Sequence, residues 1–280
     1  MQPLPLSVAG PRLTKASSDP LFQRTLVKVV RQSQHLFGGH GEVADGETWT
    51  GLPVIFDEVF TGLYRLGRFS AASFLGVEPD ISVHAKLLTG GLVPLSLTLA
   101  SESIFRAFES DDKSDALLHG HSYTAHAVGC QVALESVREM QKMDTQGDWA
   151  WAKIASQEGG LLSADEDGTW SVWNPEFILW LSQLPTSYVD GVWALGTVLA
   201  IRLASVDGTQ GYQGSAAKEI QAALLRGSGS DDESGWSVHT RVLGNTLYLM
   251  TGQNTTQKSV KRLENRLRRA LWTAQGGSQA

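Results

Sequence analysis

The stretch VIFDEV, residues 54–59, most constrains the fold, because an apolar run ends there at two adjacent carboxylates, Asp57 and Glu58. The run does not alternate between apolar and polar residues, which is typical of a strand buried on both faces of a parallel sheet. Further strands are predicted at DISVHA, residues 80–85, and at PLSLTLA, residues 94–100. The segment between the first two strands is long enough for the crossover that parallel neighbours require. The sequence therefore predicts an α/β domain.

Helical periodicity surrounds these strands. A helix is predicted from Asp19, its N-cap, with an apolar side made of Leu21, Phe22, Leu26, Val29 and Val30. A second helix is predicted over residues 123–143, and the polar residues 144–171, which contain a Gly-Gly pair, are predicted to form a loop or linker.

The last hundred residues differ in pattern from the rest. Antiparallel strands turning at Gly196, a helix ending at Gly227, two short strands and a basic helix predict a small α+β domain. We therefore expect an atypical N-terminal segment (residues 1–18), a large domain (19–170) and a small C-terminal domain (171–280).

Composition and charge exclude several classes of protein. The net charge of −6 gives no general attraction for nucleic acid. The basic residues 258–272 are spaced as an amphipathic helix with a solvated cationic face. No apolar run reaches the length of a membrane span, so neither nucleic acid nor a membrane is an expected partner. The single cysteine, Cys130, excludes an internal disulfide and fits a reducing compartment. Because no targeting signal is evident, we expect the cytoplasm or the mitochondrion.

Four familiar motifs fail here. GHGEVA, residues 39–44, has the loose dinucleotide pattern but lacks its strand–turn–helix setting, and VIFDEV resembles a Walker B strand without any P-loop. No serine stands in a G-x-S-x-G elbow. His119, His121 and His126 lie close together without cysteines or carboxylates at ligand spacing, so we interpret them as polar loop residues and expect no metal site.

Asp57 and Lys86 are the remaining candidates for a functional site. Each follows the end of a predicted parallel strand, where ligands of such sheets bind. A carboxylate and a lysine placed there suit a cofactor with a basic ring nitrogen and an aldehyde, as in pyridoxal 5′-phosphate (PLP). From spacing alone, an ordinary surface ion pair stays open as the alternative.

Three segments in order carry a more specific signal: IFDEVFTGLYRLGR, DISVHAKLLTGGLVPLSLTLAS and LLHGHSYTAHAVGCQVALES. Together they resemble the class III aminotransferases of PLP fold type I. The chain is most similar to the 7,8-diaminopelargonate branch of biotin synthesis, including the aminotransferase half of eukaryotic bifunctional enzymes with dethiobiotin synthetase. The resemblance implies a mostly parallel large domain, incomplete in this chain, and a small C-terminal α+β domain.

The same resemblance assigns roles position by position. Asp57 would pair with the pyridine nitrogen of PLP, and Lys86 would bond covalently to the cofactor. Ser122 would reach the cofactor phosphate of the neighbouring subunit of a homodimer, and Gly120 would lie beside the substrate. Arg241, in RVLGNTLYLM, would bind the substrate carboxylate through two parallel hydrogen bonds.

The implied activity is transfer of an amino group from S-adenosylmethionine to 8-amino-7-oxononanoate. A complete enzyme of this type also has a phosphate cradle, an aromatic residue that stacks on the ring, and N-terminal aromatics in the substrate pocket. None of these matches this chain, so we expect an N-terminally truncated module. The alternatives are a non-catalytic remnant and another class III aminotransferase, such as one for ornithine or 4-aminobutyrate.

Overall fold

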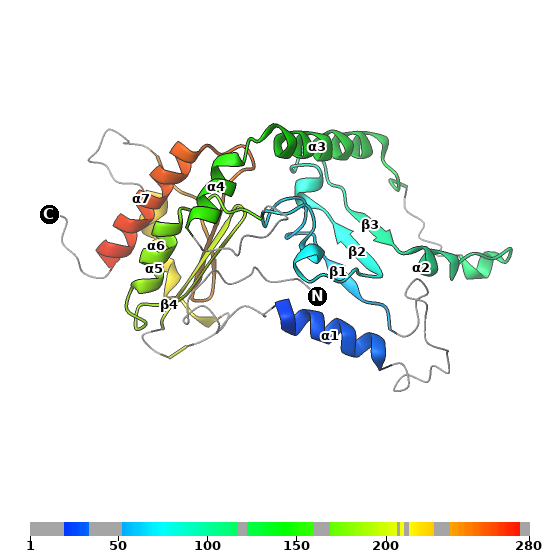
Figure 1. The fold of residues 1–280 in the computed structure, drawn as a ribbon, viewed down its shortest axis with the longest axis horizontal. Helices are drawn as coiled ribbons and strands as arrows, with labels where there is room; N and C mark the ends of the chain where they lie inside the picture. The colour runs from blue at the N-terminus through cyan, green and yellow to red at the C-terminus, as the bar shows by residue number, and fades with distance from the viewer. Residues whose placement is uncertain are drawn as a thin grey trace. The chain divides into compact units, whose positions relative to one another are not determined.

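The computed structural model describes residues 20–33, 52–116, 122–159, 169–205, 208–209, 213–226 and 236–274. They fall into two compact units, divided between Met143 and Asp144 (Figure 1). This division lies earlier in the chain than the predicted boundary at residue 170. The expected N-terminal segment, residues 1–18, lies outside the described residues.

The first unit is built on a three-stranded sheet in the order β1-β2-β3. Its strands are β1 (Ile55–Asp57), β2 (Ile81–His84) and β3 (Leu97–Ala100). Strands β1 and β2 are parallel, as the sequence predicts. Strand β3 runs antiparallel to β2, because the connection between them holds only the short 3-10 helix η4 (Lys86–Leu88) and no crossover helix. The predicted strand at residues 94–100 is thus present but shorter.

The first unit also contains helices and 3-10 helices. They are α1 (Pro20–Gln32), η3 (Ala71–Phe74), α2 (Glu102–Arg106), η5 (Lys113–Asp115) and α3 (Ala127–Gln146), the last of which continues past Asp144. Val27 of α1, Phe56 of β1, Ala72 of η3 and Leu75 form a buried cluster. This cluster covers one face of β1.

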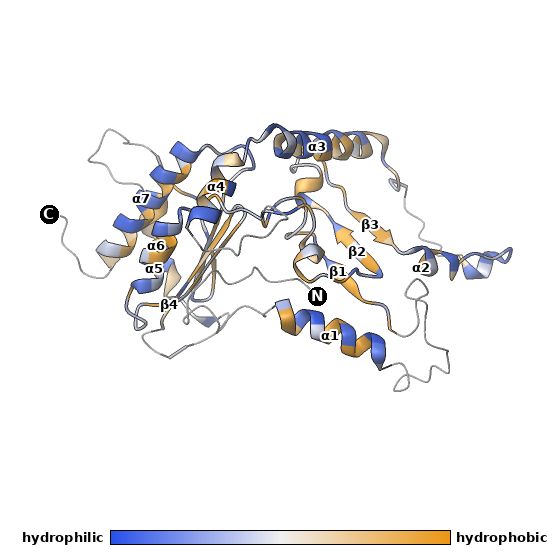
Figure 2. Cartoon of the chain, in the orientation of Figure 1, coloured by the Kyte–Doolittle hydropathy of each residue, from blue (hydrophilic) through white to orange (hydrophobic). Residues whose placement is uncertain are grey.

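Helix α1 forms as predicted, but its apolar side is not the buried one. Gln23 and Val27 are buried. Leu21, Phe22 and Val29 are 69%, 58% and 51% exposed. Figure 2 shows apolar residues in α1 and along β1 to β3. In β3 every residue is exposed, including Leu97 and Leu99. The part of the unit that is described therefore leaves apolar side chains of α1 and β3 open to solvent.

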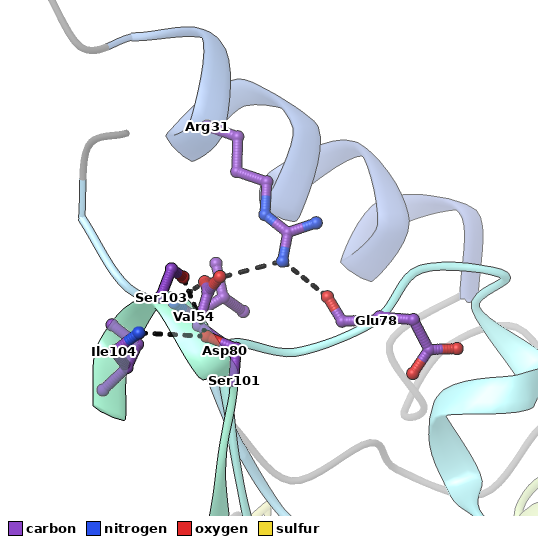
Figure 3. Close-up of polar contacts among 7 residues, drawn as sticks. All are labelled: Arg31, Val54, Glu78, Asp80, Ser101, Ser103 and Ile104. Carbon is purple, nitrogen blue, oxygen red and sulfur yellow. Dashed lines mark hydrogen bonds and ion pairs between the residues drawn. The ribbon is translucent and has the colours of Figure 1, made fainter. Parts of the chain in front are cut away.

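Asp80 ties α1 to the starting ends of β1 and β2 (Figure 3). Its Oδ2 accepts a hydrogen bond from Val54 N at 2.7 Å and lies 3.5 Å from the Arg31 guanidinium. Its backbone N–H donates to Val54 O at 2.9 Å, and its carbonyl accepts from Ser101 N at 2.8 Å. Arg31 also donates to Glu78 O. Through its carboxylate and its backbone, Asp80 thus connects the ends of four segments, away from the ends of β1 and β2 that carry Asp57 and Lys86.

The second unit contains a four-stranded antiparallel sheet in the order β4-β5-β7-β6. The strands are β4 (Val189–Leu195), β5 (Val198–Leu203), β6 (Arg241–Leu243) and β7 (Thr246–Met250). The helices are α4 (Ala150–Glu158), α5 (Pro175–Gln183), α6 (Ala217–Arg226) and α7 (Gln257–Ala274). The predicted turn at Gly196, the helix before residue 227, the two short strands and the basic helix are all confirmed.

The predicted loop over residues 144–171 is wrong for its middle part, where α4 forms. Trp149, Ala152 and Ser156 are buried and recur at helical spacing. Trp149 stacks on Trp170 and donates from Nε1 to Gln253 O at 2.9 Å. Apolar packing on one side of α4 thus outweighs the polar composition that favours a loop. In the described part of the chain, no helix has the length and apolar character that a membrane span needs.

Candidate active site

Asp57 and Lys86 lie at the C-terminal ends of two neighbouring parallel strands of the first sheet. Asp57 is the last residue of β1 and lies opposite Val83 of β2. Strand β2 ends at His84, and Lys86 opens the 3-10 helix η4 immediately afterwards. The structure thus brings the two residues to the C-terminal ends of the parallel strands, which is where parallel sheets bind ligands. This end of the sheet is called the sheet edge below.

The Asp57 carboxylate is half-buried, and its Oδ1 accepts a hydrogen bond from Val59 N at 3.0 Å. Side chains alternate along a strand, so Asp57 and Glu58 point to opposite faces. Asp57 shares its face with Val83, whereas Glu58 shares the face of the buried Phe56. The two adjacent carboxylates therefore have separate surroundings.

Lys86 is exposed, and its backbone has an unusual conformation. Its φ of 52° lies in the left-handed region, which non-glycine residues rarely adopt and which is often found at functional sites. Lys86 Nζ lies 5.2 Å from the centre of the Phe60 ring. The turn after Lys86 is held in place, since Ser136 of α3 donates to Leu87 O at 2.8 Å and Thr89 to Val93 O at 2.7 Å.

Glu58 is a buried carboxylate, only 2% exposed, with three hydrogen-bond donors. Ser70 Oγ donates to Oε1 at 2.8 Å, Ala71 N to Oε2 at 2.9 Å and Ala72 N to Oε1 at 3.2 Å. The Glu58 N–H donates to Val83 O at 2.9 Å. These contacts give the Glu58 side chain a structural role, on the face opposite Asp57.

Two buried polar atoms near this edge have no hydrogen-bond partner among the described residues: Thr61 Oγ1 and His84 Nδ1. The other ring nitrogen of His84, Nε2, lies 3.1 Å from Ser82 Oγ. Sequence reasoning singled out neither His84 nor Phe60. The alternation of β2 was a usable signal for His84, because it places His84 and Ser82 on one face.

The remaining predicted site residues are Ser122, Gly120 and Arg241. Ser122 is exposed in a turn that precedes α3, and Gly120 lies outside the described residues. Arg241 is exposed at the start of β6, in the second unit, opposite Tyr248 of β7. The roles expected for these three residues remain predictions.

The histidines considered for a metal site are only partly described. His126 Nδ1 accepts a hydrogen bond from Gly129 N at 3.0 Å, at the start of α3. His119 and His121 lie outside the described residues, as do residues 39–44. Across the described ranges, no group of three His, Cys, Asp or Glu side chains could hold a metal ion.

Comparison with known proteins shows which family and which solved structures this chain resembles. The family model for class-III aminotransferases matches residues 48–164. The bifunctional dethiobiotin synthetase/adenosylmethionine-8-amino-7-oxononanoate aminotransferase of Emericella nidulans is 50% identical over 97% of this chain and 33% of its own length. The mitochondrial bifunctional dethiobiotin synthetase/7,8-diamino-pelargonic acid aminotransferase of Oryza sativa subsp. japonica is 40% identical over 90% of this chain and 26% of its own. This chain thus spans a third or less of these two relatives.

Solved structures agree on the fold. The adenosylmethionine-8-amino-7-oxononanoate aminotransferase of Methanocaldococcus jannaschii has a TM-score of 0.64 at 22% identity and is matched over 90% of this chain and 49% of its own. A PLP-bound amine transaminase from an uncultivated Pseudomonas species has the same TM-score at 23% identity, over 92% of this chain and 49% of its own. The predicted α/β aminotransferase fold is therefore confirmed.

Proposed function

We propose that this chain, whose residues 48–164 match the class-III aminotransferase family model, supplies the aminotransferase site of a biotin-synthesis enzyme. The site transfers an amino group from S-adenosylmethionine to 8-amino-7-oxononanoate, giving 7,8-diaminononanoate, with PLP as cofactor. The observation that carries the proposal is the placement of Asp57 and Lys86 at one edge of a parallel strand pair. The names of the fungal and plant relatives support the choice of substrates.

The residues at this edge fit PLP. The cofactor needs a carboxylate beside its ring nitrogen and an amine beside its aldehyde, and the half-buried Asp57 and the exposed Lys86 offer these groups on adjacent strands. When bound, the protonated ring withdraws electrons from the substrate carbon that loses its proton. This is the chemistry that a transaminase requires.

Within this chain, each residue has a defined task. The Asp57 carboxylate would keep the proton on the ring nitrogen, because a nearby negative charge favours the protonated ring. Lys86 would hold the cofactor through its Nζ and, as a free amine, would move the proton from and to the substrate carbon. Arg241 binds the substrate carboxylate, and its planar guanidinium suits that ligand.

A transamination assay tests this proposal. We expect the wild-type chain, loaded with PLP, to form 7,8-diaminononanoate with S-adenosylmethionine as donor. Lys86→Ala abolishes turnover because no other amine replaces Nζ, and Asp57→Asn lowers kcat by about 100-fold or more because an amide cannot hold the ring proton. Lys113→Ala, a substitution of an exposed lysine in the same unit, is the matched control and keeps full activity.

Other outcomes distinguish the alternatives. Turnover with ornithine or 4-aminobutyrate, without any with S-adenosylmethionine, would assign the chain to another class III activity. A folded wild-type protein with no turnover on any of these donors would identify it as a non-catalytic remnant.

The proposal includes a homodimer in which Ser122 of one subunit reaches the cofactor phosphate held by the other. The exposed position of Ser122 is compatible with that role. Mixed subunits provide the test: Lys86→Ala and Ser122→Ala chains, each impaired alone, assemble one intact site per mixed dimer. Random mixing should recover about a quarter of wild-type activity. If mixing recovers nothing, Ser122 does not serve a neighbouring site.

The proposed compartment is the cytoplasm or the mitochondrion. The rice relative is named as mitochondrial. Fractionation of the native host, with detection by antibody, decides between the two.

A further inference from the structure

An aromatic ring lies against the lysine on which the proposed function rests. Lys86 Nζ is 5.2 Å from the centre of the Phe60 ring, within the distance at which a ring face attracts an ammonium group. Phe60 belongs to the loop that leaves β1 after Asp57, whereas Lys86 follows β2. The ring therefore restricts the position of Nζ from the neighbouring strand.

The loop that carries Phe60 is held by its own backbone. Gly62 N donates to Glu58 O at 3.0 Å, and Leu63 N donates to Phe69 O at 2.7 Å. Leu63 and Tyr64 are buried with φ values of 57° and 64°, in the left-handed region. Such conformations persist only where the surrounding contacts enforce them. The loop therefore has one defined shape.

Glu58 closes this loop at its two ends. Its backbone begins the loop, and its carboxylate accepts hydrogen bonds from Ser70 Oγ, Ala71 N and Ala72 N, where the loop ends. A buried carboxylate is stable only when such donors compensate for the lost water. The three bonds therefore resist any opening of the loop.

Because Gly62 has no side chain, the same loop can pack closely against β2. A Cβ atom at this position would lie 3.0 Å from Glu58 Oε2 and 3.0 Å from His84 Nδ1. A side chain at Gly62 would therefore displace the carboxylate, the imidazole or the loop itself. His84 stands just ahead of Lys86, so this packing links the Glu58 loop to the strand that delivers the lysine.

We infer that Glu58 and Phe60 are positioning residues for Lys86: the Glu58 carboxylate fixes the loop, and the loop holds the Phe60 ring against Nζ so that the amine is oriented for an aldehyde ligand. The inference rests on the proposed function for the identity of that ligand, PLP. The geometry between ring and ammonium exists in the cofactor-free chain and is tested there.

The test uses the cofactor-free protein with its lysines dimethylated by ¹³C-formaldehyde and a borohydride reductant, observed by NMR. Lys86→Arg identifies the Lys86 methyl signal by its loss. In the wild type we expect this signal to be displaced by the ring current of Phe60 from the signals of exposed lysines such as Lys113. Phe60→Leu returns it to their position, and Phe60→Tyr keeps it displaced.

The Glu58 part of the inference is tested in the same spectra. Glu58→Gln, and the milder Ser70→Ala, move the Lys86 signal part of the way toward that of Lys113, although Phe60 is unchanged. The matched controls Glu102→Gln and Phe105→Leu, both at exposed positions of α2, leave it in place. In parallel, the Kd for PLP rises about threefold to tenfold in Phe60→Leu and Glu58→Gln.

Two results would overturn the inference: a Lys86 signal that coincides with those of exposed lysines in the wild type, or one that neither Glu58→Gln nor Ser70→Ala moves. Failure of the proposed function is a separate result. In that case PLP would not attach to Lys86, while the ring-current displacement would still be observed.

Discussion

At the scale of single residues, the adjacent carboxylates Asp57 and Glu58 differ in exposure and in hydrogen bonding. Asp57 keeps part of its carboxylate accessible at the sheet edge, whereas Glu58 is buried and bonded to three donors. Because alternation sends the two side chains to opposite faces, one can serve a ligand while the other holds the backbone. The alternation of side chains along one strand thus separates the carboxylate proposed to bind a ligand from the one that holds the backbone.

Arg241 is expected to bind the substrate carboxylate through a charged hydrogen-bond pair. Arg241→Gln removes that pair and should raise KM for 8-amino-7-oxononanoate by about 10-fold to 100-fold. Steady-state kinetics measure the effect. Arg226→Gln, at the exposed end of α6, is the control and should leave KM unchanged. Equal KM values for the two variants would remove Arg241 from the substrate site.

Glu264 of α7 is a second buried carboxylate, with a different consequence for stability. Burial raises its pKa to about 7, although the hydrogen bond from Asn174 N and the charges of Arg268 and Lys261 act to lower it. In the unfolded chain the pKa is near its ordinary value of 4.5. Its stabilising contribution is therefore complete below pH 4.5 and is lost as the pH rises through about 7.

The resulting prediction concerns the second unit. Its free energy of unfolding should fall between pH 5 and pH 8, with up to about 3 kcal/mol of the loss due to Glu264. Glu264→Gln, which cannot ionise, should remove that part of the pH dependence, whereas the exposed Glu158→Gln should not. Urea unfolding at the two pH values measures both. An unchanged pH dependence in Glu264→Gln would contradict the assignment.

At the scale of elements, Asp80 is a polar connection between several segments of the first unit. Its carboxylate bonds to Val54 N and lies beside Arg31, so that the ends of β1, β2 and α1 depend on one side chain (Figure 3). Leu21 and Phe22 of helix α1 are exposed, whereas Val27 packs in the buried cluster. Asp80 therefore adds a polar attachment of α1 to the apolar one made by Val27.

Asp80→Asn should lower the protection of these elements. An amide keeps one acceptor but loses the charge, so we expect a loss of about 1–3 kcal/mol in the stability of the first unit. Hydrogen exchange followed by mass spectrometry should show faster exchange in α1 and at Val54. Asp111→Asn, at an exposed position, is the matched control. Faster exchange in both variants, or in neither, would contradict this role for Asp80.

Some elements can be predicted from sequence patterns and others cannot. The parallel pair β1 and β2, the hairpin at Gly196 and helix α7 follow from apolar runs and helical spacing, and the structure contains them. Helix α4 was missed because only one side of it is apolar and its flanks are polar. The contacts of Phe60 and of Glu58 with Ser70 could not be predicted, since they depend on the path of a loop with left-handed residues.

At the scale of the whole molecule, the expected site residues are divided among several parts. Asp57 and Lys86 belong to the first unit and Arg241 to the second. Ser122 is proposed to serve another subunit. The chain spans 33% of the bifunctional relative from Emericella nidulans, so its activity is a proposal about one part of a longer architecture. Family motifs suggest these roles, which remain predictions, and motifs carry no information on how the parts meet.

The most direct test of the account is to locate the lysine that holds PLP. The purified chain is incubated with PLP, reduced with borohydride and digested, and the modified peptide is identified by mass spectrometry. We predict about one PLP per chain on Lys86, with none on Lys113 and no comparable modification in Lys86→Ala. Modification spread over exposed lysines, and equal in wild type and Lys86→Ala, would contradict the central claim that this sheet edge is a PLP site.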